Sequence, residues 1–438
     1  MKEKHLLIIL TFLFFILSVK PQINEESVYL SSLNNYTSPL NKVRKEIIDK
    51  ALKSLPKREE VDELKMALTM KNAQQEYSLN EAESAYLIYK WIQKNIHFNC
   101  TFKSLNDETT TYNNGKGSYY GIAHIFITMC KILGLKANYI EGYTIELGFV
   151  NDKKLMNKFD YGWNSVIIDN KYYLLDVIGE LYYEPLAGCM GLSSDYYFCS
   201  YPEHFVRFHF PLDSKWQLLT QTIDLETFLS QTSLYYSFFR YGFKSISPDK
   251  SILKVNNTLK IVIINENPDT NYTYLDFRVE CKFCRDYSEY DDYYLVSNIK
   301  ERTEIDVIFN GKRQYLLEIS LSNKDNVDSK FADYIINNEI EQNPPLHFPI
   351  QFFFLNGLKL IEPLYSPLKR GETIYFKILF ESANELIIED NKNKTTLTKE
   401  GHLFTGNFFI NDIEYNEVSI YFGYELADHI LLFIYQTN

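Results

Sequence analysis

Hydrophobic residues in the first half of the chain recur with the spacing of α-helices. The clearest case is a predicted helix whose apolar face runs from Ile122 to Leu133. Its apolar positions follow one another at intervals of three and four residues, which builds one buried face: Ile122, Ile125, Phe126, Met129, Cys130 and Leu133. Gly134 follows where a helix C-terminus favours glycine, and residues 137–143 are typical of a strand.

Three further helices are predicted upstream. The pattern over residues 43–55 is helical up to Pro56, which breaks it. A second short helix should follow, and Ser78 with Glu81 forms a capping-box motif that predicts the start of a third. The residues expected on the apolar faces of the three are Val43, Ile47, Ala51 and Leu55, then Val61, Leu64 and Leu68, then Ala85, Ile88, Tyr89 and Ile92.

Strand patterns dominate the rest of the chain. The turn residues Asp169 and Asn170 separate two apolar runs and predict a hairpin, which places Tyr161 and Asp176 on adjacent strands. Short strand-like runs, such as LKIVIIN and YLLEISL, indicate one sandwich up to about Asn338. Further runs, such as IYFKILF and EVSIYFGY, indicate a second one after the linker at Pro344.

Residues 78–178 resemble the core of transglutaminase-like domains. Gly117, Gly121 and Ala123 match the family pattern Gly-x-Cys-x-Gly-Tyr-Ala, while Asn164 and Asp176 match the strands that carry its His and Asp. The landmarks HFP, WQLL and FFxxG of kyphoscoliosis-peptidase-like proteins follow at residues 209–211, 216–219 and 238–242. All three tryptophans of the chain coincide with family landmarks: Trp91, Trp163 and Trp216.

This resemblance implies an α+β fold, with a papain-like transglutaminase core followed by two Ig-like β-sandwich domains. The expected organisation is a signal peptide (1–18), an N-terminal helical segment (19–77) and the core (78–203). A linker segment with the first sandwich (204–343) and the second sandwich (344–438) complete it.

Two of the three positions of the family's catalytic triad hold tyrosine. Tyr119 stands at the position of the nucleophilic Cys, and Tyr161 at that of the His. In the triad a thiolate attacks, the imidazole transfers the proton and the Asp orients the imidazole. A phenol, with a pKa of about 10, serves neither as that nucleophile nor as that base. We therefore predict a pseudoenzyme, in which Asp176 accepts a hydrogen bond, the Tyr161 hydroxyl being the candidate donor.

Alternatives remain open at this site. Ser118 is a weak substitute nucleophile with His124 as its base, which would leave an active acyl-transfer enzyme, a peptidase or a protein cross-linker. Its other interpretation is a helix N-cap. A former cleft lined by Tyr119, Tyr120, Tyr161 and Trp163 would suit a peptide or a glycan, since tyrosine has an apolar ring and a polar tip. A third interpretation is a structural module whose cleft these tyrosines fill.

Charge, cysteines and the N-terminus restrict the setting. The net charge of −12 disfavours nucleic acid as a partner. Residues 1–18 have the basic start and apolar run of a signal peptide, so we expect a secreted or luminal protein; an uncleaved membrane anchor is the alternative. Six cysteines then favour disulfides of undetermined pairing, although Cys130 is expected to be a buried thiol. Five N-x-[ST] sequons permit glycosylation.

No cofactor or metal is expected. The CxxC at Cys281 has no second pair at zinc-finger spacing. His204 and His209 lack a recognised ligand pattern around them, and the acidic run from Asp286 lacks EF-hand spacing. The function that these features favour is protein binding or scaffolding, with a protein or peptide partner of unknown identity.

Overall fold

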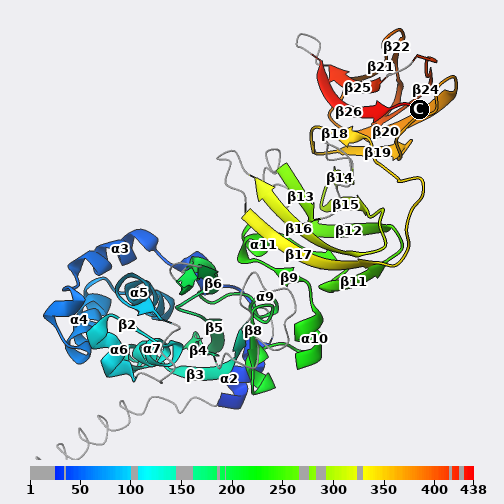
Figure 1. Cartoon of the computed structure of the whole chain (residues 1–438). Coiled ribbons are helices and arrows are strands. Elements are labelled where there is room, and N and C mark those ends of the chain that lie inside the picture. Colours follow the sequence, from blue (N-terminus) through cyan, green and yellow to red (C-terminus); the bar gives the residue numbers. More distant parts are fainter. Residues whose placement is uncertain are drawn as a thin grey trace, which may run out of the picture. The chain divides into compact units, whose positions relative to one another are not determined.

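The computed structural model describes residues 25–33, 36–99, 107–144, 161–184, 188–192, 194–265, 276–282, 293–322, 329–413, 417–423 and 429–438. They form two compact units, which divide between Phe228 and Leu229 (Figure 1). The predicted signal peptide, residues 1–18, lies outside the described residues. Within them, no helix is both long and apolar enough to cross a membrane.

Helices, one four-stranded antiparallel sheet and two two-stranded sheets make up the described part of the first unit. The two-stranded sheets are β1 (His97–Phe98) with β2 (Lys116–Gly117), and β6 (Glu180–Glu184) with β7 (Gly188–Leu192). The α-helices up to the four-stranded sheet are α2 (Glu25–Ser32), α3 (Lys45–Ser54), α4 (Glu63–Glu76), α5 (Glu81–Asn95), α6 (Glu108–Asn114) and α7 (Tyr119–Leu133). The predicted central helix is confirmed as α7, which buries all six of the expected apolar residues and ends at Gly134 in the left-handed conformation (φ 85°). Cys130 is a buried free thiol, as expected.

Two local predictions upstream are wrong. Helix α5 is capped by Asn80 with Glu83, which form the reciprocal capping box, instead of by Ser78 with Glu81. Ser78 itself has a positive φ of 48° before the helix. Helix α4 exists, but Leu64 and Leu68 are exposed, because the face that it buries carries Met66, Ala67, Met70 and Ala73.

The four-stranded sheet of the first unit has the strand order β5-β4-β3-β8. Its strands are β3 (Ala137–Thr144), β4 (Tyr161–Ile168), β5 (Lys171–Leu175) and β8 (His209–Pro211). The predicted hairpin is confirmed: β4 pairs with β5 through Asp169 and Asn170, both at positive φ (49° and 58°). Helix α7 packs against β3 and β4. Since β8 pairs with β3, residues after 204 that we assigned to the linker segment contribute to this sheet.

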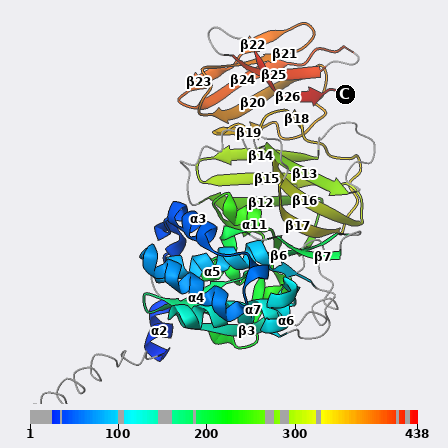
Figure 2. The same cartoon turned by 90° about the vertical axis from the view of Figure 1, so that its left-hand side faces the viewer.

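The second unit contains two β-sandwiches (Figures 1 and 2). Each consists of two mainly antiparallel sheets around its own apolar core. In the first sandwich, one sheet has the strand order β10-β12-β15-β14 and the other has the order β11-β17-β16-β13. In the second sandwich, the two orders are β18-β26-β25-β21-β22 and β19-β20-β24-β23. Strands of the first sandwich are β9 (Ser233–Leu234), β10 (Phe243–Ser247), β11 (Ile252–Val255), β12 (Thr258–Asn265), β13 (Asp276–Lys282), β14 (Tyr294–Ile299), β15 (Arg302–Ile308), β16 (Gln314–Ser322) and β17 (Ser329–Asn338). Those of the second are β18 (Ile350–Gln351), β19 (Leu358–Glu362), β20 (Thr373–Phe380), β21 (Glu385–Glu389), β22 (Lys394–Thr396), β23 (Thr398–Glu400), β24 (Leu403–Phe409), β25 (Glu417–Gly423) and β26 (Ile430–Gln436).

The two sandwiches share contacts as well as a connection. Leu295 of β14 and Ile308 of β15 are buried in the core of the second sandwich. The Gln351 amide bonds both backbone groups of Val296, at 2.8 and 2.9 Å. The predicted linker at Pro344 lies between β17 and β18, the last and first strands of the two sandwiches.

Candidate functional site

The N-terminus of α7 is the position that the resemblance to transglutaminase-like domains assigns to the nucleophile. The chain enters it through β2 (Lys116–Gly117), which pairs with β1 (His97–Phe98). Gly117 has no room for a side chain, because a Cβ there would lie 2.2 Å from Oγ1 of Thr111. Ser118 follows as the N-cap, and its buried hydroxyl accepts a hydrogen bond from the Gly121 N–H at 3.5 Å. The capping interpretation of Ser118 is therefore confirmed.

Tyr119, the first residue of α7, packs against Tyr161 of β4. Their ring centroids lie 5.6 Å apart with the ring planes at 45°. Tyr119 is partly buried against the apolar core, whereas Tyr161 is 2% exposed. At the two positions that the resemblance assigns to the nucleophile and the base, the structure therefore has two packed aromatic rings.

Asp176, at the third triad position, is buried and receives three hydrogen bonds. Its Oδ2 accepts from the Tyr161 hydroxyl at 2.8 Å, so the expected contact is present. The Nε2 of His209 lies 2.8 Å from the same oxygen. Its Oδ1 accepts from the Ile178 N–H at 2.9 Å. A buried carboxylate needs such donors, since water cannot reach it.

His209 is the functional-site residue that sequence reasoning missed. It lies on β8 opposite Thr144 of β3, and its side chain is buried. Its ring stacks on Phe205 at 4.2 Å and meets the edge of Trp163 at 4.9 Å. Two features of the sequence could have indicated this contact: Asp176 has no His at the expected triad position, and His209 lies inside the strand-like HFP landmark. No local pattern joins two residues 33 positions apart.

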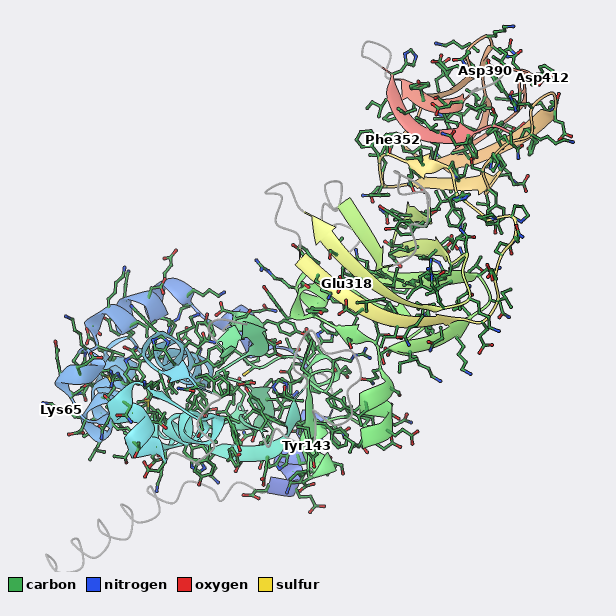
Figure 3. All side chains as sticks on the ribbon, in the orientation of Figure 1. Lys65, Tyr143, Glu318, Phe352, Asp390 and Asp412 are labelled. Atoms are coloured by element: carbon green, nitrogen blue, oxygen red, sulfur yellow. The ribbon has the colours of Figure 1, made fainter. Side chains whose placement is uncertain are left out.

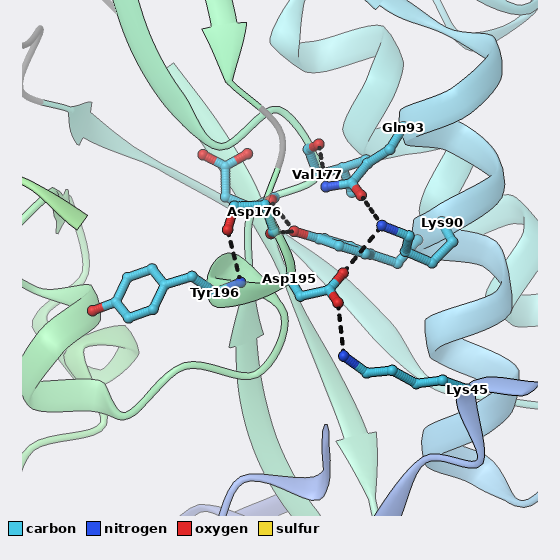
Figure 4. A network of polar contacts seen from close by, with 9 residues as sticks. Lys45, Lys90, Gln93, Asp176, Val177, Asp195 and Tyr196 are labelled. Carbon is cyan, nitrogen blue, oxygen red and sulfur yellow. Dashed lines mark hydrogen bonds and ion pairs between the residues drawn. The ribbon is translucent and has the colours of Figure 1, made fainter. Parts of the chain in front are cut away.

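The backbone around Asp176 is fixed by polar contacts from α5 and from the segment after β7 (Gly188–Leu192). The Tyr89 hydroxyl donates to the carbonyl oxygens of Asp176 and Ser194, at 3.2 and 2.7 Å. Lys45 and Lys90 reach the Asp195 carboxylate at 3.0 and 3.1 Å (Figure 4). Burial opposes ionisation of Asp195, but hydrogen bonds from these lysines and Tyr86 outweigh it and lower its pKa.

A second aromatic group lies beside this centre. Tyr120 and His124 of α7 have ring centroids 4.1 Å apart, and Tyr139 of β3 contacts both at 5.4 Å. Burial lowers the pKa of His124, although Glu108 acts in the opposite direction. No hydrogen bond joins Ser118 to His124 within the described part of the chain, so the proposed serine–histidine pair is not assembled there.

The four residues predicted to line a binding cleft differ in exposure. Tyr161 and Trp163 are buried, at 2% and 1% exposure, and they pack within the core. Tyr119 and Tyr120 are partly exposed. Any ligand-binding surface on this side of the described structure is therefore narrower than the sequence suggested and does not extend to Tyr161 or Trp163.

Within the described residues, the candidate metal ligands that the sequence suggested form no metal-binding group, and two of the cysteines are free thiols. The described residues contain no group of three or more His, Cys, Asp or Glu that would hold a metal ion. Cys199 is a buried free thiol instead of a disulfide partner, and burial raises its pKa. Cys100, Cys284 and the acidic run from Asp286 lie outside the described residues.

Comparison with known proteins supports a transglutaminase-like core. Residues 68–177 match the sequence profile of the transglutaminase-like superfamily. Kyphoscoliosis peptidase of Mus musculus is 25% identical over 205 residues, which cover 45% of this chain and 31% of that protein. Hillarin of Drosophila melanogaster is 26% identical over 186 residues, which cover 37% of this chain and 22% of that protein. The chain therefore matches less than a third of the length of either relative.

Solved structures give weaker likenesses. A TGase crystal structure has a TM-score of 0.20 at 13% identity, covering 38% of this chain and 36% of that chain. The titin Ig tandem domains have a TM-score of 0.14 at 8% identity, covering 43% and 90%. Scores this low carry no argument by themselves. Residues 68–177 form a transglutaminase-like core, and the chain is distantly similar to kyphoscoliosis peptidase over less than half of its length.

Proposed function

We propose that this protein is a catalytically inactive transglutaminase-like protein that acts in protein binding or scaffolding. One observation carries the claim of inactivity: the Asp176 carboxylate is engaged by the Tyr161 hydroxyl and by His209, while Tyr119 stands where the resemblance expects the nucleophile. The carboxylate that would orient an imidazole at position 161 is bonded there by a phenol, and the imidazole that it does contact is the buried ring of His209.

The chemistry at positions 119 and 161 supports inactivity. Acyl transfer needs a nucleophile that is ionised near neutral pH and a base that exchanges protons there. A phenol with a pKa of about 10 meets neither need. Loss of triad members removes a factor on the order of 10⁴ to 10⁶ in turnover.

The rival function is acyl transfer through Ser118, either as a peptidase or as a cross-linker. Its hydroxyl lies at the start of α7, as a nucleophile would. However, that hydroxyl accepts the bond that caps the helix, and His124 packs against Tyr120 and Tyr139. A nucleophilic serine requires a base within hydrogen-bond reach, so this rival has less support.

Restoring the lost side chains tests the cause of inactivity. Tyr119→Cys alone and Tyr119→Cys with Tyr161→His would be labelled with iodoacetamide at pH 7, and the adduct at residue 119 quantified by mass spectrometry. The double variant should label faster than the single one, because an imidazole beside Asp176 favours thiolate, whereas the N-terminus of α7 favours it equally in both. Tyr375→Cys, at a position 44% exposed in the second sandwich, supplies the rate of an ordinary thiol.

Equal labelling at residue 119 in the single and double variants would mean that residue 161 is not the main defect. Since His209 already bonds Asp176, adding His209→Phe to the double variant separates competition for the carboxylate from loss of the imidazole. Faster labelling only in this triple variant would assign the defect to that competition.

Secretion is part of the proposal and rests on residues 1–18. After expression in eukaryotic cells, the mature chain should be recovered from the medium with an N-terminus shortly after Ser18. Intact Met1 on cytosolic protein would contradict secretion and leave the binding proposal unaffected.

A further inference from the structure

Tyr120, His124 and Tyr139 form a partly exposed aromatic patch that has no part in the Asp176 network. Tyr120 and His124 are one turn apart on α7, so their side chains share a face. Tyr120 meets Tyr139 edge-on, with ring centroids 5.4 Å apart and planes at 71°. The Tyr139 side chain fills the space beside Gly162 of β4. A Cβ at position 162 would lie 2.2 Å from the hydroxyl oxygen of Tyr139.

Carboxylates flank this aromatic patch. On β3 burial alternates from Tyr139 onward, so Tyr139, Glu141 and Tyr143 share the side that is partly or fully exposed. Tyr143 is labelled in Figure 3. Glu108 of α6 acts electrostatically on His124, and its carboxylate accepts from the Thr128 hydroxyl of α7 at 2.9 Å.

Helix α7 itself brings little positive charge to the patch. Lys131 is the only Lys or Arg of α7, and it lies in the last turn, at the end opposite Tyr120. Burial lowers the pKa of His124, so its ring is uncharged at neutral pH and does not repel a cation. The patch therefore combines electron-rich ring faces with negative charge.

We propose that the aromatic patch binds Lys or Arg side chains of an extended segment in a partner protein. Cations are attracted to tyrosine ring faces, and Arg also stacks on them. Glu141 and Glu108 supply the opposite charge, and the chain's net charge of −12 attracts a basic segment at long range. This inference rests on the proposed binding function and names the partner's chemistry.

The test uses the full-length protein and a synthetic peptide that alternates Arg and Gly. Binding is measured by titration calorimetry, with a Glu-Gly peptide of equal length as the charge control. Tyr120→Leu and Tyr139→Leu keep apolar bulk but remove the ring face, so each should weaken binding roughly two- to thirty-fold. Tyr120→Phe should retain most of the affinity, and Tyr375→Leu, an exposed tyrosine elsewhere, should change nothing.

Circular dichroism of each variant shows whether it is folded, so that weaker binding is not mistaken for misfolding. If Tyr139→Leu does not fold, the affinity of Tyr120→Leu decides the test. Affinity should fall as salt is raised. No binding of the Arg-Gly peptide, or unchanged affinity in Tyr120→Leu, would overturn the inference. Binding of a neutral oligosaccharide that is insensitive to salt and lost in Tyr120→Leu would also overturn it in favour of a glycan site. None of these results depends on turnover, so the claim of inactivity stands or falls separately.

Discussion

Removing the Tyr161 hydroxyl is the sharpest perturbation of the Asp176 network. Tyr161→Phe keeps the ring that packs on Tyr119 and deletes one of the three donors to the carboxylate. The bonds from His209 and Ile178 remain. A hydrogen bond to a charged group contributes about 1.5 to 3 kcal/mol to stability. Asp176 is buried, so water would not replace the lost donor and the loss should fall within this range. We expect the free energy of unfolding of the first unit to fall by that amount.

The assay is thermal unfolding by near-UV circular dichroism at pH 7. For a unit of this size, each kcal/mol lowers the Tm by about 2 to 4 °C, so a fall of about 3 to 12 °C is expected. Tyr375→Phe, which removes a hydroxyl from a tyrosine that is 44% exposed, is the matched control. His209→Ala should cost more, about 3 to 5 kcal/mol, because it removes both a donor to Asp176 and the ring between Phe205 and Trp163. A Tyr161→Phe Tm equal to that of the control would refute the network as a source of stability.

Further predictions concern pH and modularity. Burial and two neighbouring carboxylates raise the pKa of Glu63 from its ordinary value of 4.5 to about 7. Glu63 therefore destabilises the fold increasingly as the pH rises between these two values. Glu63→Gln should raise the Tm at pH 8 and change it little at pH 4. For Glu304, burial opposes ionisation, but hydrogen bonds from Lys359 and two other cations lower the pKa to about 2. Its stabilisation is therefore complete above about pH 4.5 and lost as pH falls toward 2; Glu304→Gln should flatten the acid side of the second unit's Tm profile. A fragment beginning at Leu346 should give an all-β circular dichroism spectrum, but a lower Tm than in the full chain, because Leu295 and Ile308 no longer cover its core.

Local patterns in the sequence were sufficient for much of the first unit. The apolar repeat predicted α7 and its end at Gly134, because a helix face and a glycine C-cap are set by neighbouring residues. The hairpin at Asp169 placed Tyr161 close enough to Asp176 for their hydrogen bond. Periodicity could not choose between the two apolar faces of α4, where burial of Met66 left Leu64 exposed.

Contacts between distant segments were the part that could not be predicted. His209 reaches Asp176 only because β8 pairs with β3, and a strand of three residues carries little periodic signal. The burial of Trp163 likewise depends on Phe205, which lies 42 positions later in the sequence. The sequence therefore predicted the hydrogen bond from Tyr161 to Asp176, but not the imidazole of His209 that bonds the same carboxylate.

Turnover by the unmodified chain tests the central claim most directly. Purified full-length protein would be incubated with a glutamine-containing peptide and a labelled amine, and amine incorporation and peptide cleavage would be followed by mass spectrometry. We predict no product above the protein-free rate, since neither Tyr119 nor Tyr161 supplies the chemistry of the triad. Product that forms with the intact chain and disappears in Ser118→Ala would contradict the account and assign the activity to the serine.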